Sequence, residues 1–117
     1  MPRIDSDRLY GTLNLLILRT LEGEPRHGLA ILRAIEAAAD SGLRIEEGAL
    51  YPALHRLERD GLIHGSWGIS ESNRRAKFYE LTAAGRKRCD QEIDRWLNHT
   101  LSVARVLDLD LGAAWAS

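Results

Sequence analysis

The 117-residue sequence predicts a mainly α-helical fold with one small β-hairpin. Apolar residues recur at steps of three and four in four separate stretches, which is the period of an amphipathic helix. Between the third and fourth stretches, residues 62–81 hold two strand-like segments on either side of a polar loop. We therefore expect three helices, a hairpin and a longer final helix, in that order along the chain.

The first two helices are predicted over residues 8–22 and 27–39. Gly23 and Pro25 end the first, because glycine suits the residue after a helix and proline prevents its continuation. After the second helix, residues 43–46 alternate between apolar and charged, which favours a short extended segment.

The third helix is predicted to begin near Gly48 or Ala49 and to end at Gly61. Pro52 sets the start, because proline is tolerated in the first turn, where backbone N–H groups lack helical partners. Its apolar face follows helical spacing and consists of Leu50, Leu54 and Leu57.

The predicted hairpin has strands at residues 62–67 and 76–81. The loop over residues 68–75 is too polar and too long for a tight turn, so we expect it to reach outward. Thr82 is a suitable N-cap for a fourth helix that runs to about Leu107.

Size and composition exclude several classes of protein. The chain is long enough for one domain, and its hydrophobic content of 44% is ordinary for a soluble protein. No apolar run approaches the roughly 20 residues that cross a bilayer, and the N-terminus lacks a signal-like apolar core. Cys89, the single cysteine, with scattered histidines makes no metal site. We expect a cytoplasmic protein with no membrane partner, metal or cofactor.

The exposed side of the third helix is suited to the major groove of DNA. Small residues there permit close approach, an aromatic ring and an imidazole can reach sugar, phosphate or base, and two arginines can hold phosphates. These residues are Gly48, Ala49, Tyr51, His55, Arg56 and Arg59. The alternative is a charged helix face that is simply solvated.

The hairpin loop is locally basic although the net charge of the chain is −1. Residues 72–79 hold three positive charges and no acid. Asn73, Arg74, Arg75 and Lys77 would form the tip of a wing, where cations suit a narrow minor groove or flanking phosphates. An edge hairpin kept soluble by charge is the alternative.

The start of the second helix is a further candidate contact. Its free N–H groups at His27 and Gly28, with Arg26 nearby, could bind a phosphate. A simple cap and turn explains the same residues.

The fourth helix has an apolar face that a small core cannot wholly cover. Such faces usually mark a partner, and the simplest partner is the same helix of a second chain. The face consists of Cys89, Ile93, Trp96, Leu97, Leu101 and Ala104. Trp96 would either pack in the dimer or form a stacking platform for a flat ligand.

No constellation of catalytic residues is recognisable, so we expect the chain not to be an enzyme. A helix followed by a basic hairpin predicts a winged helix-turn-helix DNA-binding protein. The rival is a winged-helix module that binds an acidic protein partner and never contacts DNA.

In the segments that carry these features, the chain resembles the PadR family of bacterial transcriptional regulators. The similarity lies in GTLNLLILRTL at 11–21, HGLAILRAIE at 27–36, EEGALYPALHRLERDGLI at 46–63 and SWGISESNRRAKFYELTAAGR at 66–86. It covers residues 9–107, and the combination of LYPALHRLE with RRAKFYELT is highly specific.

The resemblance implies a winged-helix dimer that represses transcription by occupying a double-stranded DNA operator. It adds Pro52 to the candidate DNA contacts and divides the chain into a DNA-binding domain at 1–81, a dimerisation helix at 82–107 and a tail at 108–117. The N-terminal helix would contribute to the dimer.

The resemblance also implies a small aromatic effector bound beside Trp96 at the dimer interface. The pocket or interface residues would be Leu15, Arg19, Cys89, Ile93, Trp96, Leu97 and Thr100. This sequence departs from the family pattern at Ile93, which has no aromatic ring, and at Arg19, whose charge would suit an anionic aromatic ligand.

Together these expectations describe a ligand-responsive homodimeric repressor on a pseudo-palindromic operator. Two third helices would lie about one DNA turn apart, roughly 34 Å. A ligand that changes the angle between the fourth helices would alter that spacing.

Overall fold

The computed structural model describes residues 6–112, with side chains from Thr12 onward. Leading and trailing residues 1–5 and 113–117, including part of the predicted tail, lie outside this range. The elements in chain order are α1 (Ser6–Thr20), β1 (Arg26–His27), α2 (Gly28–Ala38), α3 (Glu47–Arg59), β2 (Ile63–Ile69), β3 (Arg75–Leu81) and α4 (Ala83–Leu107).

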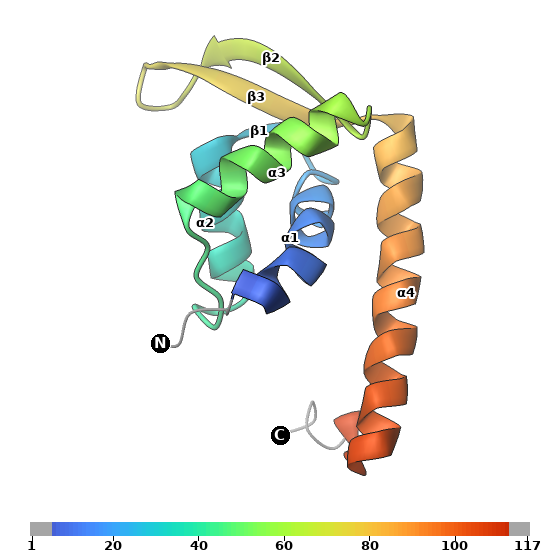
Figure 1. Ribbon diagram of the computed structural model, residues 1–117. Helices are drawn as coiled ribbons and strands as arrows, with labels where there is room; N and C mark the ends of the chain where they lie inside the picture. Colours follow the sequence, from blue (N-terminus) through green and yellow to red (C-terminus); the bar gives the residue numbers. More distant parts are fainter. Residues whose placement is uncertain (1–5, 113–117) are drawn as a thin grey trace.

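Figure 1 shows two parts of the molecule. The first three helices and the sheet form a body, with the hairpin lying across the top of α3, while α4 runs down one side and extends beyond the body. The predicted mainly α fold with a small hairpin is confirmed. Among the described residues, no helix combines the length and the apolar character needed to cross a membrane.

The core of the body is built by the inward faces of the first three helices. Ile17 from α1, Ile31 from α2, and Leu50 and Leu54 from α3 are fully buried. Burial of each such side chain contributes about 1.5–3 kcal/mol relative to leaving it exposed. The leucine spacing predicted for α3 therefore identifies its core face correctly, and the other side of the helix is left for a partner.

The start of α2 differs from the prediction. Arg26 and His27 pair with Tyr79 and Phe78 of β3, so they form a short strand that the sequence did not reveal. His27 has the extended conformation of an N-cap, and its Nδ1 accepts a hydrogen bond from the backbone N–H of Ala30 at 3.2 Å. The helix therefore begins one residue later than predicted, with a histidine as its cap.

The prediction for the start of α3 was slightly wrong. The helix begins at Glu47, so Pro52 lies in its second turn and not in its first. Proline cannot donate to the carbonyl four residues earlier, which belongs to Gly48. Both residues are exposed, so water can satisfy that carbonyl. The segment before α3 forms no strand, and the backbone N–H of Ile45 donates instead to the Glu36 carboxylate at 3.1 Å.

The hairpin is longer and its loop tighter than predicted. Strand pairing continues to Ile69 opposite Arg75, and β1 adds a third strand in the order β1-β3-β2. The Ser70 N–H donates to the Arg74 carbonyl and the Asn73 N–H to the Ser70 carbonyl, both at 2.8 Å. Asn73 has a φ of 61°, which closes a turn followed by a left-handed residue, a common three-residue hairpin loop.

The first turns of α4 are anchored to the body. Thr82 caps the helix as predicted, because its Oγ1 accepts from the Gly85 N–H at 3.0 Å and donates to the Gly61 carbonyl at 2.6 Å. Gly85 has no room for a side chain, since a Cβ there would lie 1.9 Å from the Leu62 carbonyl oxygen. One turn later Cys89 is fully buried.

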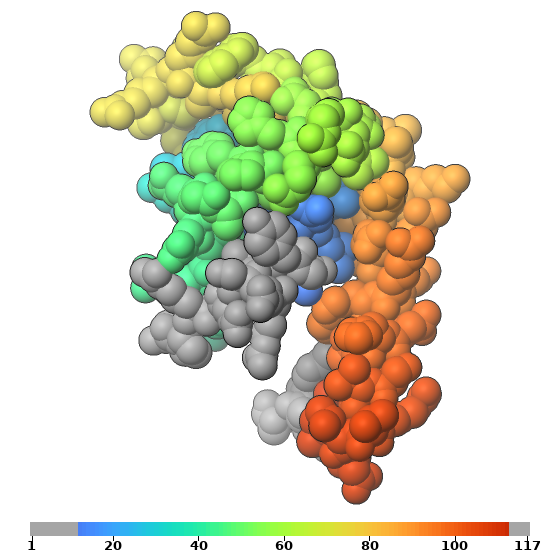
Figure 2. Space-filling view, viewed as in Figure 1, coloured from blue at the N-terminus to red at the C-terminus, as the bar shows by residue number. Residues whose placement is uncertain are grey.

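The rest of α4 leaves the body. Beyond Cys89, only Ala104 is buried among the residues of this helix. Figure 2 shows the C-terminal half of α4 standing clear of the sheet and the other described helices in this view. The predicted end of the helix at Leu107 is confirmed, with Asp108 in a left-handed conformation as its C-cap.

Candidate nucleic-acid interface

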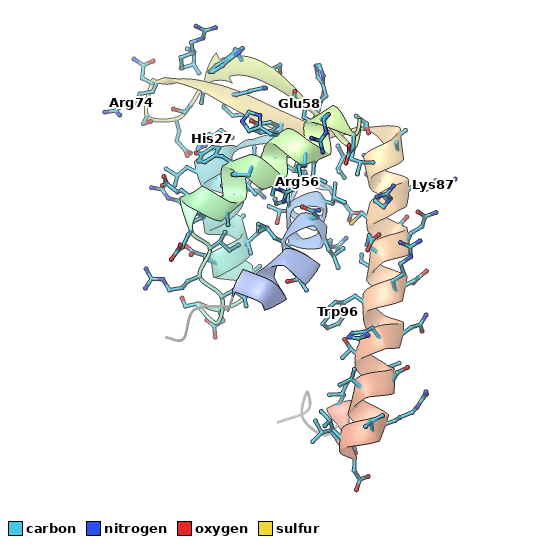
Figure 3. All side chains as sticks on the ribbon, in the orientation of Figure 1. His27, Arg56, Glu58, Arg74, Lys87 and Trp96 are labelled. Atoms are coloured by element: carbon cyan, nitrogen blue, oxygen red, sulfur yellow. The ribbon has the colours of Figure 1, made fainter. Side chains whose placement is uncertain are left out.

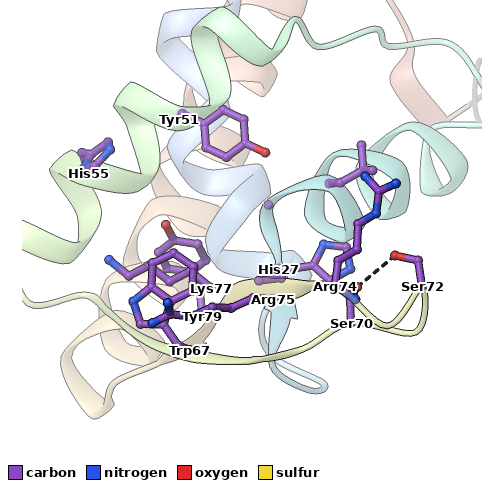
Figure 4. Close-up of a pocket in the computed structure, with 13 residues that line it drawn as sticks. His27, Tyr51, His55, Trp67, Ser70, Ser72, Arg74, Arg75, Lys77 and Tyr79 are labelled. Carbon is purple, nitrogen blue, oxygen red and sulfur yellow. Dashed lines mark hydrogen bonds between the residues drawn. The ribbon is translucent and has the colours of Figure 1, made fainter.

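A groove of about 730 Å³ lies between α3, the start of α2 and the hairpin (Figure 4). Its lining contains five basic or imidazole side chains, three further aromatic or phenolic rings, and no carboxylate. The lining residues are His27, Gly28, Leu29, Tyr51, His55, Trp67, Ser70, Ser72, Arg74, Arg75, Ala76, Lys77 and Tyr79. A concave surface of this composition is suited to an extended anion.

The helical wall of the groove is formed by Tyr51 and His55, one turn apart on α3. Tyr51 is 40% exposed, whereas the preceding Leu50 is fully buried, so the helix presents its polar side to the groove. The Tyr51 ring lies over Gly28, where an added Cβ would be 2.8 Å from the ring. Glycine at the start of α2 therefore lets α3 pack closely against it.

The opposite wall is the hairpin, which brings Arg74 and Arg75 to the groove. Arg74 is exposed at the loop, where Ser70 and Ser72 bond to each other at 3.0 Å. The Arg75 guanidinium lies 4.5 Å from the centre of the Trp67 ring, within the range of a cation–π contact. This contact holds the arginine on the groove side of the wing.

Trp67 was missed as a site residue at the sequence level. It is 61% exposed, on the same strand face as the buried Ile63 and diagonally across from Arg75. The sequence signal that could have identified it is a large apolar residue immediately before the polar loop, facing a strand that carries basic residues. A tryptophan whose exposed ring supports an arginine is suited to contact sugar or base.

Lys77 does not lie at the wing tip, where it had been predicted. It lies in the middle of β3, and its Nζ is 2.7 Å from Oε1 of Glu58 on α3. Both side chains are about 29% exposed. The hydrogen bond from Lys77 lowers the pKa of Glu58 below its ordinary value, and the same bond raises the pKa of Lys77.

The other predicted DNA contacts lie outside the lining of the groove. Arg26 donates to the Thr20 carbonyl at 3.3 Å and pairs with Glu24 at 3.4 Å. Ala49 is half-buried against the core, and Arg59 pairs with the adjacent Asp60 at 3.6 Å. The remaining residues lie elsewhere on α3 or in the loop, and they are Gly48, Pro52, Arg56 and Asn73.

The predicted interface residues of α4 fall into two groups. Ile93, Trp96 and Leu97 are 36–41% exposed and adjacent on one face. Figure 3 shows Trp96 about midway along the helix. Thr100 is half-buried on the same helix, whereas Cys89 is fully buried at its start.

On α1, Leu15 packs against the core and Arg19 pairs with Glu22. The charge that had been expected to line a ligand pocket is therefore already paired in the single chain. Among residues 6–112, no cluster of three or more His, Cys, Asp or Glu could hold a metal ion.

Comparison with known proteins places this architecture in a family. The transcriptional regulator PadR-like family matches residues 17–91. A transcriptional regulator from Clostridium thermocellum superposes with a TM-score of 0.77 at 28% identity, covering 85% of this chain and 96% of that one. A PadR family transcriptional regulator from Eggerthella lenta gives a TM-score of 0.73 at 30% identity, covering 90% and 89%.

A curated relative extends the comparison to a mycobacterial protein. The transcriptional regulator Rv3488 of Mycobacterium tuberculosis is 44% identical over 45 residues, which are 38% of this chain and 41% of that protein. The family match covers more than half of the chain and belongs to regulators, so the expectation that the chain is not an enzyme is confirmed. The chain belongs to the PadR-like family of transcriptional regulators.

Proposed function

We propose that this regulator binds duplex DNA in a sequence-specific manner, as a homodimeric repressor on a pseudo-palindromic operator. The observation that supports this best is the groove between α3 and the hairpin, which is lined by cations and aromatic rings and by no acid. Affinity for duplex DNA derives largely from neutralised phosphates, and specificity from side chains that reach base edges.

The helical wall of the groove supplies specificity, and the hairpin wall supplies affinity. Tyr51 and His55 project from the side of α3 that faces away from the core, which is the side that enters a major groove. Arg74 and Arg75 on the hairpin contact the flanking phosphates or minor groove. Arginines in these positions orient the protein and add affinity that depends on salt.

Dimerisation through α4 provides the second half of the binding surface. Ile93, Trp96 and Leu97 form an apolar strip that a single chain leaves 36–41% exposed. Covering such a strip with the same helix of a second chain removes apolar surface from water. Two groove surfaces held about 34 Å apart would then face one side of the duplex.

A regulatory ligand belongs to the same proposal. A flat aromatic molecule that stacks on Trp96 in the dimer would change the angle between the two copies of α4. It can shift operator occupancy only as far as its affinities for the two geometries differ. Quenching of tryptophan fluorescence by an added aromatic compound, with loss of operator binding at the same concentration, would support this part.

The DNA-binding test uses the double variant Arg74→Ala with Arg75→Ala. It should weaken binding to every duplex and flatten the slope of log affinity against log salt by roughly 2, because two phosphate contacts are lost. Fluorescence polarisation with the promoter duplex beside its own gene, measured at several salt concentrations, gives the slope.

Arg33→Ala with Arg105→Ala is the matched control, since both residues are exposed and lie outside the groove. A control that flattens the slope equally would show a general charge effect and remove the wing from the proposal. A wild-type chain that ignores all duplexes but binds an acidic protein would support the rival protein-interaction module.

The dimer test uses Trp96→Ala. Removing this ring from the exposed strip should shift the monomer–dimer equilibrium of the chain toward monomer, as sedimentation at decreasing concentration would show. Lys87→Ala is a control on the same helix, with its side chain directed to the outer side of α4 (Figure 3). A Trp96→Ala variant that stays fully dimeric at the lowest concentration would exclude a packing role for this residue.

A further inference from the structure

The Glu58 carboxylate joins α3 to the hairpin through both of its oxygens. Oε1 accepts from the Lys77 Nζ at 2.7 Å, and Oε2 accepts from the backbone N–H of Gly65 at 3.0 Å. Figure 3 shows Glu58 where α3 meets the hairpin. One side chain of the recognition helix therefore holds both strands of the wing.

The sequence at position 65 is adapted to this contact. A Cβ on Gly65 would lie 2.4 Å from Lys77 Cε and 2.9 Å from Glu58 Oε2, so a side chain would push the pair apart. Ser70 bonds to Arg74 across the hairpin, and alternation of the ladder then turns the N–H of Gly65 toward the open edge of β2. Glu58 satisfies that otherwise unpaired edge group.

The pair also changes the charge that the groove presents. Lys77 lines the groove together with Arg74 and Arg75, yet its ammonium is bonded to a carboxylate and lies 5.5 Å from the Tyr79 ring. Each cation that neutralises a phosphate strengthens binding to every duplex equally and adds nothing to discrimination. A lysine held away from phosphate therefore leaves a larger share of the affinity to residues that contact bases.

We propose that Glu58 is a specificity-determining positioning residue, which fixes the wing against α3 and withholds Lys77 from the phosphate backbone. This inference rests on the proposed DNA-binding function. It replaces the earlier expectation that Lys77 is itself a phosphate contact. Glu58 acts through Lys77 and Gly65 and does not contact DNA.

The test measures the salt dependence of binding for Glu58→Gln. Glutamine can still accept from the Gly65 N–H but has no charge to retain Lys77, which becomes free to neutralise one phosphate. The salt slope should steepen by about 0.9, so affinity falls roughly three-fold more between 50 and 200 mM salt than in the wild type. The preference for the promoter duplex over a random-sequence duplex of equal length should fall.

Two further variants separate this role from a simple stabilising contact. Lys77→Gln alone should leave the wild-type slope unchanged, and Glu58→Gln with Lys77→Gln should return the steeper slope to the wild-type value. Glu80→Gln is the matched control, because it removes the same charge from an exposed position on β3 that does not line the groove. This control should change the salt slope by less than the value of about 0.9 expected for one phosphate contact.

The outcomes distinguish this inference from the function on which it rests. If the wild type binds the promoter duplex but Glu58→Gln leaves the slope unchanged, only the role of Glu58 is overturned. A Lys77→Gln variant with a slope flatter by about 1 would show that Lys77 already contacts phosphate, and would also overturn it. A wild-type chain that binds no duplex would remove the proposed function as well.

Discussion

The body and the outer part of α4 solve the problem of burying apolar surface in different ways. In the body, side chains from all three helices and the sheet enclose one another, and Ile17, Ile31 and Leu54 are fully buried within a single chain. Along α4 beyond Cys89, Ile93, Trp96, Leu97 and Leu101 remain 36–41% exposed although they follow the same helical spacing.

The difference shows that amphipathic spacing predicts a buried face but not which chain buries it. The core of the body is buried by residues of its own chain. The outer part of α4 presents a comparable stripe that the described residues of its own chain leave partly open, which is the reason for proposing a second copy as its partner. Stability of the two regions should therefore depend differently on protein concentration.

The largest expected effect comes from the same substitution made in each region. Leu54→Ala should lower the free energy of unfolding by about 2–5 kcal/mol, because it opens a cavity in a fully packed core. Leu101→Ala should lower it by an amount that depends on concentration, because in the proposed dimer the lost contacts lie between chains. Urea unfolding at several protein concentrations measures both.

The same concentration dependence in both variants would contradict this difference between the body and the outer part of α4. If the effect of Leu101→Ala were the same at every concentration, the outer part of α4 would be stabilised within its own chain. If the effect of Leu54→Ala depended strongly on concentration, the body would itself require the dimer to fold.

The fold was largely predictable because its elements are specified locally. Leucine spacing indicated the buried face of α3, and Thr82 marked the start of α4. The strand at Arg26–His27 was missed, because two residues carry no period and their pairing with β3 depends on the packed sheet. The tight turn was missed because Asn73 adopts a left-handed conformation that its sequence context did not reveal.

The candidate site was less predictable because its contacts, like the pairing of β1 with β3, depend on tertiary packing. Basic residues near the hairpin loop were visible in the sequence, but their partners were not. Glu58 and Lys77 are 19 residues apart, and only the docking of the hairpin on α3 brings them together. Charge counted along the chain therefore did not show that one of these cations, Lys77, is paired with a carboxylate of α3.

A second, smaller effect concerns the reactivity of Cys89, which locates the boundary between the body and the outer part of α4. Burial, with Glu22 and Asp90 nearby, raises the pKa of the Cys89 thiol to about 11, although Arg19 opposes this. Relative to its ordinary value of 9.0, the thiolate share near pH 8 falls by roughly 100-fold. Cys89 should therefore resist alkylation by iodoacetamide until the chain unfolds.

Mass spectrometry of the alkylated protein, with and without urea, measures this protection. Ile93→Cys in a Cys89→Ala background is the matched probe one turn further along α4, where the side chain is 36% exposed. It should react in dilute protein and be protected at dimer-forming concentrations. Rapid labelling of native Cys89 would move the boundary toward the start of α4.

The smallest effect concerns the pH dependence of the contact that joins α3 to the hairpin. Because its pKa is lowered in the folded protein, Glu58 contributes stability above about pH 4.5, which is lost as the pH falls through the folded value. The pKa of Lys77 is raised, so its contribution is present below about pH 10.5 and is lost as the pH rises through its higher folded value. The difference in unfolding free energy between wild type and Glu58→Gln should be constant between these limits and shrink outside them.

The size of that difference should stay at or below about 1 kcal/mol, because both side chains are partly exposed and solvent screens the pair. Glu92→Gln, which breaks the surface pair with Arg95 on α4, is the comparison in the other region, and its effect should be smaller still. Urea unfolding of the three proteins from pH 3.5 to 8 measures both. Since a contact this weak adds little to stability, a large loss of DNA discrimination in Glu58→Gln would have to come from the freed lysine and the loosened wing.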